Sequence, residues 1–144
     1  MACDDRDLFD RLAGIIHGET QVHEHRVDLT AARIWRMTGR GELDFGGSEY
    51  QGASVEEIPA EKRHPDDDYG WWTLGPGVYR VAFNERLTEG RAVLQSLPRL
   101  LDAGAYIPVR AAEAGGEITA LLVVGDAGLA VKENARLAGL HAPL

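Results

Sequence analysis

Histidine residues near the N-terminus are the first residues in this chain whose type and spacing could do chemistry. His23 and His25 lie two positions apart, so on a strand both imidazoles would share one face, a spacing that suits a zinc or nickel ion. Glu24 and His17 lie beside them. Two imidazoles need a third protein ligand, and the sequence nominates none. Solvent-exposed histidines are therefore the favoured interpretation, with a metal pair as the alternative.

Acidic and aromatic runs occur in the middle of the chain. The run Asp66-Asp67-Asp68 lacks the alternating acids and the glycine of a calcium loop, which favours a solvated loop over a divalent-ion site. The pair Trp71-Trp72 could stack on a base or a sugar, but strand alternation favours one ring in the core and the other at an edge or a subunit contact. Neither the glycine-rich Gly-x-x-x-x-Gly-Lys-Ser/Thr phosphate loop nor the Gly-x-Ser-x-Gly nucleophile elbow is present. These residues alone define no active site.

The balance of charge restricts the possible ligands. The chain has 15 Lys and Arg against 23 Asp and Glu, a formal charge of −8, and Lys62 and Lys132 are its only lysines. This charge disfavours binding to a nucleic acid duplex, because attraction to phosphates dominates such affinity. A small anionic ligand held by a few arginines stays possible, although arginine-rich composition also agrees with a GC-rich genome.

Length and composition indicate one domain. The 144 residues, 44% of them hydrophobic, suit a single domain over residues 1–144. No apolar run approaches the roughly 18 residues of a membrane span, and the N-terminus does not resemble a signal peptide. Cys3 is the only cysteine, which excludes an internal disulfide. We expect no membrane association and a cytoplasmic location.

The elements that must position any site are predicted to be short strands. The 17 Gly and 6 Pro suit strands joined by many turns. Asp4 or Asp5 can cap an N-terminal helix whose apolar positions are Leu8, Phe9, Leu12, Ile15 and Ile16. Residues 26–37 alternate with the period of a strand, and residues 48–68 are polar enough for a long exposed connection.

From residue 69 onward the pattern predicts strand after strand, spaced by about 10 residues, which is typical of an antiparallel sandwich or barrel. The predicted strands cover residues 69–74, 78–83, 91–97, 105–109, 118–124 and 129–131. The run from Ile118 to Val124 is the best candidate for a strand buried on both faces, and residues 98–104 form a turn or a short helix. The predicted fold class is all-β with a short N-terminal helix.

Five segments, in this order, resemble the motifs of one protein family. They are Asp5-Arg6-Asp7-Leu8, the stretch from Gln21 to Leu29 that ends Val27-Asp28-Leu29, the stretch from Gly39 to Phe45, the hairpin from Leu74 to Arg86 that contains Gly75-Pro76-Gly77, and Asn134 to Leu140. The family is the dUTPase and dCTP deaminase superfamily, especially its archaeal and bacterial deaminase-like branch. The resemblance runs from about residue 4 to residue 140.

The resemblance implies a β-clip fold, assembled as a homotrimer with active sites between subunits. Members bind a deoxynucleoside triphosphate with Mg²⁺ on the phosphates, and they either hydrolyse dUTP to dUMP and pyrophosphate or deaminate dCTP. This chemistry needs a carboxylate as general base for the attacking water, and Arg, Ser and Gln donors for the phosphates. Backbone amides in a hairpin would recognise the pyrimidine edge.

The family's phosphate motif, Arg-Ser-Ser-Leu-x-Arg followed by a glycine, fits in two registers. One aligns Gln95, Ser96 and Arg99 with the motif but has Leu94 where its first arginine belongs. The other, anchored on Gly104, places Leu97-Pro98-Arg99 on the first three positions and Asp102 on the second arginine. The resemblance implies phosphate binding by Arg99, with Ser96, Gln95 and Arg136 of the closing motif as further candidates.

The family's catalytic carboxylates are replaced in the simplest alignment. Anchored on Gly116, the aspartate position falls on Ala111 and the deaminase glutamate falls on Leu121. The stretch from Gly104 to Gly116 is also shorter than in the family. Glu113 or Glu117 could occupy the same space if this stretch follows another path, and the alternative for both is an exposed acid in a turn. The closing motif keeps Arg136 but has Gly139 where the family has glutamine.

Two further acids fall on family positions and are expected to be structural or to contact a neighbouring subunit. Asp28 could orient a subunit or an arginine, or make a local pair, and Glu85 is expected to form a structural pair. The predicted function is hydrolysis of dUTP to dUMP and pyrophosphate. The alternative is a nucleotide-binding or structural trimer without catalysis, and dCTP deamination comes third because Leu121 cannot transfer a proton.

Overall fold

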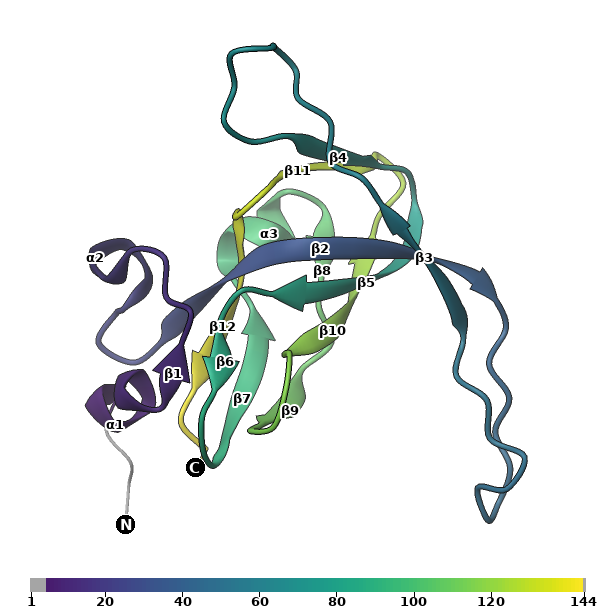
Figure 1. Cartoon of the computed structure of the whole chain (residues 1–144), viewed down its shortest axis with the longest axis horizontal. Helices are drawn as coiled ribbons and strands as arrows, with labels where there is room; N and C mark the ends of the chain where they lie inside the picture. Colours follow the sequence, from purple (N-terminus) through teal and green to yellow (C-terminus); the bar gives the residue numbers. More distant parts are fainter. Residues whose placement is uncertain (1–4, 144) are drawn as a thin grey trace.

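A long, curled antiparallel sheet forms the body of the protein (Figure 1). The computed structural model describes residues 5–143, so Cys3 and the predicted cap Asp4 lie outside the described residues. The main sheet has the strand order β8-β10-β5-β2-β12-β7-β9, with β3 also paired to β2. Its strands are β2 (Val27–Gly39), β3 (Ser54–Ile58), β5 (Gly77–Phe83), β7 (Arg91–Ser96), β8 (Ala105–Tyr106), β9 (Arg110–Glu113), β10 (Thr119–Val124) and β12 (Arg136–His141).

The long strand β2 bends the sheet, because its two halves pair with different partners. Its first residues pair with β12, whereas its second half lies between β5 and β3. Irregular registers between Ala31 and Arg33, and between Arg136 and Ala138, accompany the bend, as expected of β-bulges. The core packs inside this curl, and its largest side chains with almost no exposure include Leu29, Ile34, Val81, Phe83, Leu94, Leu122 and Leu140.

Smaller elements complete the fold. They are α1 (Asp5–Asp10), β1 (Leu12–Ala13), α2 (Gly18–Gln21), β4 (Trp71–Leu74), β6 (Arg86–Leu87), α3 (Pro98–Asp102) and β11 (Leu129–Lys132). β1 pairs with β6, and β11 pairs with β4. None of the helices described is long and apolar enough to cross a membrane. The all-β class with a short N-terminal helix is confirmed.

The N-terminal helix is shorter than predicted. It ends at Asp10, and Leu12, which the periodicity placed on its apolar face, instead pairs with Leu87. Gly14 then turns the chain at φ +86°, where a Cβ would lie 2.5 Å from the carbonyl oxygen of Asn84. The helical periodicity was misleading because the strand pairing to β6 is a contact distant in sequence.

Two other local predictions differ from the structure. The polar stretch 48–68 contains the edge strand β3, which the sequence analysis did not predict. Along β10 buried and exposed positions alternate, and Leu121 is 42% exposed, so the prediction of burial on both faces is wrong. By contrast, the expected division of the tryptophan pair is confirmed, because Trp72 is buried and Trp71 is half-buried at the edge of β4.

A buried glutamate connects the N-terminal segment to the sheet. Glu85, fully buried, accepts hydrogen bonds from the backbone N–H of Thr30 at 2.8 Å, from the Thr30 hydroxyl at 2.5 Å and from the Gln21 amide at 2.8 Å. The Gln21 amide also donates to the carbonyl oxygen of Asp28. Glu85 therefore holds two elements together through neutral donors.

Replacing Glu85 by alanine is expected to destabilise the fold by about 2–4 kcal/mol, because buried donors on Thr30 and Gln21 would lose their acceptor. The change is measured as a lower urea midpoint in equilibrium unfolding. The exposed Glu89→Ala variant is the control and should stay within about 0.5 kcal/mol of the unmodified chain. Equal midpoints for both variants would contradict a stabilising role for Glu85.

Candidate functional site

A cavity of about 680 Å³ lies between β9 and β10, and we call it the hairpin cavity. It forms because β9 pairs with β7 whereas β10 pairs with β5 and β8, so no ladder joins the two facing edges. Gly115 and Gly116, both at positive φ, make the turn between these strands. The side chains that define this cavity are Arg110, Ala111, Glu113, Glu117, Thr119 and Leu121.

Both predicted carboxylates line the hairpin cavity, but their surroundings differ. Glu117 forms an ion pair with Arg33 of β2, which also lies 3.9 Å from Glu57. Within residues 5–143, the Glu113 carboxylate has no hydrogen bond or ion pair. Glu113 is therefore the carboxylate of this cavity that has no partner among the described residues.

The rest of the hairpin cavity combines one cation with small and apolar groups. Arg110 donates from Nη1 to the carbonyl oxygen of Thr119 at 3.0 Å and from Nε to that of Ala111 at 3.3 Å, so it bridges the two strands. Ala111 and Leu121, the two positions where the family pattern has acids, lie in the same cavity. Their side chains cannot carry a proton, which leaves Glu113 and Glu117 as its acids.

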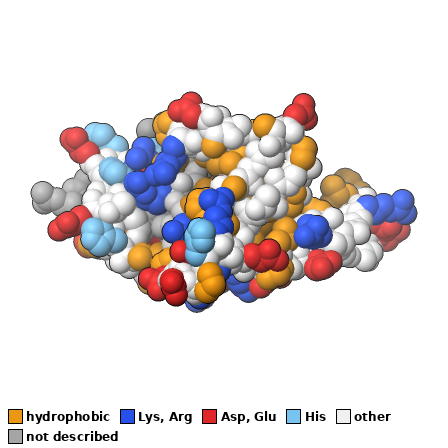
Figure 2. Space-filling model, turned by 90° about the horizontal axis from the view of Figure 1, so that it is seen from above, with side chains coloured by type: hydrophobic (Ala, Val, Ile, Leu, Met, Phe, Trp, Pro, Cys, Tyr) orange, Lys and Arg blue, Asp and Glu red, His pale blue; other side chains and the backbone are white. Residues whose placement is uncertain are grey.

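A second cavity, of about 490 Å³, lies where α3, β11 and β12 meet, and we call it the basic cavity. It contains Arg99, Lys132 and Arg136 together with Trp71, over an apolar floor that includes Leu129 and Leu137. No carboxylate of the described chain lines it. Figure 2, which views the molecule from the side that carries β4 and β11, shows groups of Lys and Arg side chains on this face of an acidic protein.

The structure brings two of the four predicted phosphate residues together. Arg99, on α3, and Arg136, on β12, line the basic cavity. Ser96 lines neither cavity, because its hydroxyl donates to the carbonyl oxygen of Ile107 at 3.0 Å and accepts from the Ile107 N–H at 2.7 Å. Gln95 is exposed on β7 and also lies outside both linings. Ser96 thus connects β7 to the segment after β8.

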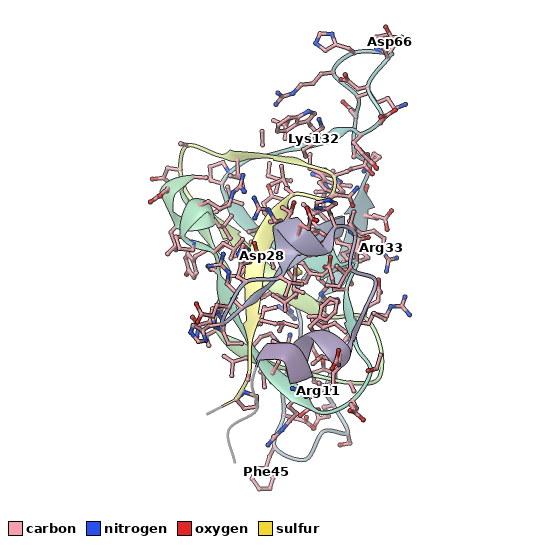
Figure 3. All side chains as sticks on the ribbon, turned by 90° about the vertical axis from the view of Figure 1, so that its left-hand side faces the viewer. Arg11, Asp28, Arg33, Phe45, Asp66 and Lys132 are labelled. Carbon is pink, nitrogen blue, oxygen red and sulfur yellow. The ribbon has the colours of Figure 1, made fainter. Side chains whose placement is uncertain are left out.

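The two acids predicted to be structural are both fully buried. Asp28 accepts from Arg26 Nε at 2.6 Å, from His23 Nε2 at 2.9 Å and from Arg136 Nη1 at 3.0 Å, all in its own chain. Figure 3 shows Asp28 within the body, next to β12. Asp28 thereby holds Arg136 at the basic cavity, while Glu85 belongs to the separate network described above.

The histidine cluster does not assemble a metal site in the part of the chain that is described. His23 binds Asp28, and His25 lies 3.7 Å from Glu24. No group of three His, Cys, Asp or Glu side chains with metal-binding geometry occurs there.

Sequence reasoning did not identify Arg110 and Lys132 as lining residues of these cavities, nor Arg33 as the partner of Glu117. Arg33 interrupts the alternation of its strand, which was a usable signal for an exceptional position. Lys132 reaches the basic cavity only because β11 pairs with β4, more than 50 residues earlier in the chain, which places Lys132 directly opposite Trp71. No local pattern marks such a pairing.

Comparisons with known proteins identify related sequences. The chain is 30% identical over 132 residues to a probable deoxyuridine 5'-triphosphate nucleotidohydrolase of Methanosarcina mazei, covering 88% of this chain and 74% of that protein. Proteins with the same description from Methanosarcina acetivorans and Archaeoglobus fulgidus are 31% and 29% identical over 125 residues, covering 83% of this chain and 70% of theirs. No protein-family model matches the chain.

The fold also has a known counterpart. The crystal structure of 2'-deoxycytidine 5'-triphosphate deaminase from Agrobacterium tumefaciens superimposes with a TM-score of 0.65 at 14% identity, covering 96% of this chain and 45% of that chain. This likeness supports the all-β, dUTPase-like fold. Together with the sequence identity over most of both proteins, it establishes that the chain belongs to the dUTPase and dCTP deaminase superfamily.

Proposed function

We propose that this protein binds a deoxynucleoside triphosphate and hydrolyses dUTP to dUMP and pyrophosphate, as the names of its archaeal relatives suggest. The observation that carries the proposal is the basic cavity, where three cations surround an opening without any described carboxylate. Arginine pairs bind phosphate oxygens in a bidentate manner, so Arg99 and Arg136 suit the triphosphate. We expect the protein to act in the cytoplasm, without a membrane partner.

The hairpin cavity would supply the base for hydrolysis. Glu113 would take a proton from water, the water oxygen would form a bond to phosphorus, and the P–O bond between the α- and β-phosphates would break. Charge on the leaving pyrophosphate would be stabilised by Arg99 and Arg136. The unpaired edges of β9 and β10 offer backbone groups to a pyrimidine.

The hairpin cavity and the basic cavity share no lining residue. We propose a homotrimer in which the hairpin cavity of one subunit faces the basic cavity of the next. A closed ring of identical subunits repeats such a head-to-tail contact at every interface. Each site would then draw Glu113 and Arg99 from different copies.

Mg²⁺ fits this arrangement as a companion of the nucleotide. The ion usually binds substrate phosphates, waters and one or two carboxylates, and needs no dedicated cage of protein ligands. Glu113 would contact the ion only through a bound water, so that its carboxylate stays available as the base. The bound ion would neutralise negative charge on the phosphates.

One set of observations favours a second candidate, a nucleotide-binding or structural protein without catalysis. Ala111 and Leu121 replace acids that the family pattern contains, and Glu117 is neutralised by Arg33. Deamination of dCTP is the third choice, since Leu121 occupies the position of its glutamate.

The proposal is tested by incubating the purified protein with Mg²⁺ and either dUTP or dCTP, and measuring pyrophosphate and ammonia. We expect pyrophosphate from dUTP and no ammonia from dCTP. A thermal-shift series with deoxynucleotides should show stabilisation by dUTP of about 2.7 kcal/mol at 100 times its Kd. Stabilisation without pyrophosphate release would support the non-catalytic candidate, and no stabilisation by any triphosphate would contradict nucleotide binding.

A further inference from the structure

Trp71 forms a wall shared by two cavities that are both rich in cations. On one side lies the basic cavity, and on the other lies a cavity of about 490 Å³ whose lining includes Arg36, Lys62 and Arg63. Both lysines of the chain are therefore among the six cations on the two sides of this ring. Figure 3 shows Lys132 where the body meets the loop that carries Asp66.

The Trp71 ring is contacted by two of these cations. The guanidinium carbon of Arg63 lies 3.6 Å from the ring centroid, and the ammonium nitrogen of Lys132 lies 5.8 Å from it. The Lys132 position is fixed by the backbone as well, because Lys132 pairs directly with Trp71 across β11 and β4. Glu133 strengthens the pairing of β11 with β4. Its backbone N–H donates to the carbonyl oxygen of Gly70 at 3.0 Å, and its carboxylate accepts the Gly70 N–H at 2.8 Å.

Only one of the three cations in the basic cavity has an ion-pair partner within residues 5–143. Arg136 is paired with Asp28, but Arg99 and Lys132 have no ion pair within residues 5–143. Glu61 is the single described acid in the linings of the two cavities, and it lies on the Arg63 side of the ring. Like charges gathered in this way repel one another, and a ligand with several negative charges would relieve that repulsion.

We propose that Lys132 and Trp71 complete a polyphosphate site with Arg99 and Arg136, and that this site recognises the phosphate chain independently of the base. The inference rests on the proposed function and adds two residues, Lys132 and Trp71, to its phosphate site. Lys132 donates to phosphate oxygens, and Trp71, stacked under Arg63, is a positioning residue that holds the Lys132 ammonium toward the cavity.

Inorganic tripolyphosphate is the probe that separates the phosphate chain from the nucleotide. Calorimetric titration of the full chain with tripolyphosphate should show binding, and Lys132→Gln should weaken it about 10-fold, the effect of losing one charge-assisted contact. The dependence of affinity on salt should also become shallower in this variant. Arg40→Gln, at an 89% exposed side chain paired with Glu42, is the matched control and should leave the affinity unchanged.

Substitutions of Trp71 and its fluorescence test the positioning role of this residue separately. Trp71→Leu should weaken tripolyphosphate binding about as much as Lys132→Gln. Trp71→Phe keeps an aromatic ring for the two cations and should therefore retain most of the affinity of the unmodified chain. Tripolyphosphate should change the tryptophan fluorescence of the unmodified chain, and this change should disappear in Trp71→Phe although calorimetry still detects binding. Thermal unfolding of each variant confirms that the fold is intact.

The outcomes distinguish this inference from the proposed function. Normal tripolyphosphate affinity in both Lys132→Gln and Trp71→Leu would overturn the inference, even if dUTP is bound and hydrolysed. Failure of the unmodified chain to bind tripolyphosphate while it binds dUTP would overturn it as well. Tripolyphosphate binding that depends on Lys132, without hydrolysis of dUTP, would uphold the inference while the proposed hydrolase activity fails.

Discussion

Replacing Glu113 by glutamine is expected to lower the rate of dUTP hydrolysis about a thousandfold, within the range that a general base contributes. Glutamine keeps the size of the side chain but cannot accept a proton from water. Since Glu113 is exposed and has no described partner, the variant should unfold at the same temperature as the unmodified chain. The measurement is the rate of pyrophosphate release at saturating dUTP and Mg²⁺.

Glu117→Gln is the matched control, because Glu117 lines the same cavity and differs in being paired with Arg33. Both partners are partly exposed, at 35% and 43%, so loss of this pair should cost less than about 1 kcal/mol of stability. Hydrolysis should fall less than about fivefold. If Glu117→Gln is the inactive variant, Glu117 is the base. If neither variant loses activity, neither glutamate is the base.

Replacing Arg99 by glutamine is expected to raise the Kd for dUTP with Mg²⁺ about 100-fold, because a bidentate arginine contact to phosphate is lost. At a concentration of dUTP that is 100 times the Kd of the unmodified chain, the stabilisation should fall from about 2.7 kcal/mol to about 0.4 kcal/mol. Arg99 is exposed on α3, so the stability without ligand should not change. Unaltered dUTP affinity would exclude Arg99 from the site.

Arg136→Gln provides an instructive comparison, because this arginine has two roles. It should weaken dUTP binding like Arg99→Gln, but it should also destabilise the unliganded fold by about 1–3 kcal/mol, since the buried Asp28 loses one of its donors. A loss of dUTP affinity in Arg136→Gln without a loss of stability would contradict the structural role of the Asp28 pair.

Mixing the Glu113→Gln and Arg99→Gln chains tests whether each site is shared between subunits. In randomly mixed trimers, about a quarter of the sites would combine an intact hairpin cavity with an intact basic cavity from the next subunit. At a dUTP concentration well below the Kd of the unmodified chain, Arg99→Gln is about 100-fold less active because it binds less dUTP, and Glu113→Gln is about a thousandfold less active. Under these conditions the mixture should recover about a quarter of the unmodified activity. No recovery, under conditions where mass analysis shows mixed trimers, would mean that both residues act from one chain.

The sequence by itself determined the family, the all-β class and the positions of many of the strands along the chain. Alternating apolar residues and the Gly75-Pro76-Gly77 turn are local signals that depend on side-chain period and backbone preference, so the strands at 78–83, 91–97 and 118–124 were predicted close to their positions. The alternation at Trp71-Trp72 correctly predicted one buried ring and one at the edge.

Only the tertiary structure decided which of these residues meet. The sequence spacing gave no reason to prefer Glu113 or Glu117 as the base. The structure distinguishes them, because Glu117 is paired with Arg33, more than 80 residues away, and Glu113 is not. Likewise, Trp71, Arg99, Lys132 and Arg136 share a cavity because β11 pairs with β4 and β12 lies near α3. Such contacts depend on the packing of distant strands, which no local period encodes. The motifs therefore identify the protein's relatives, whereas the fold determines which carboxylate is free and which cations gather.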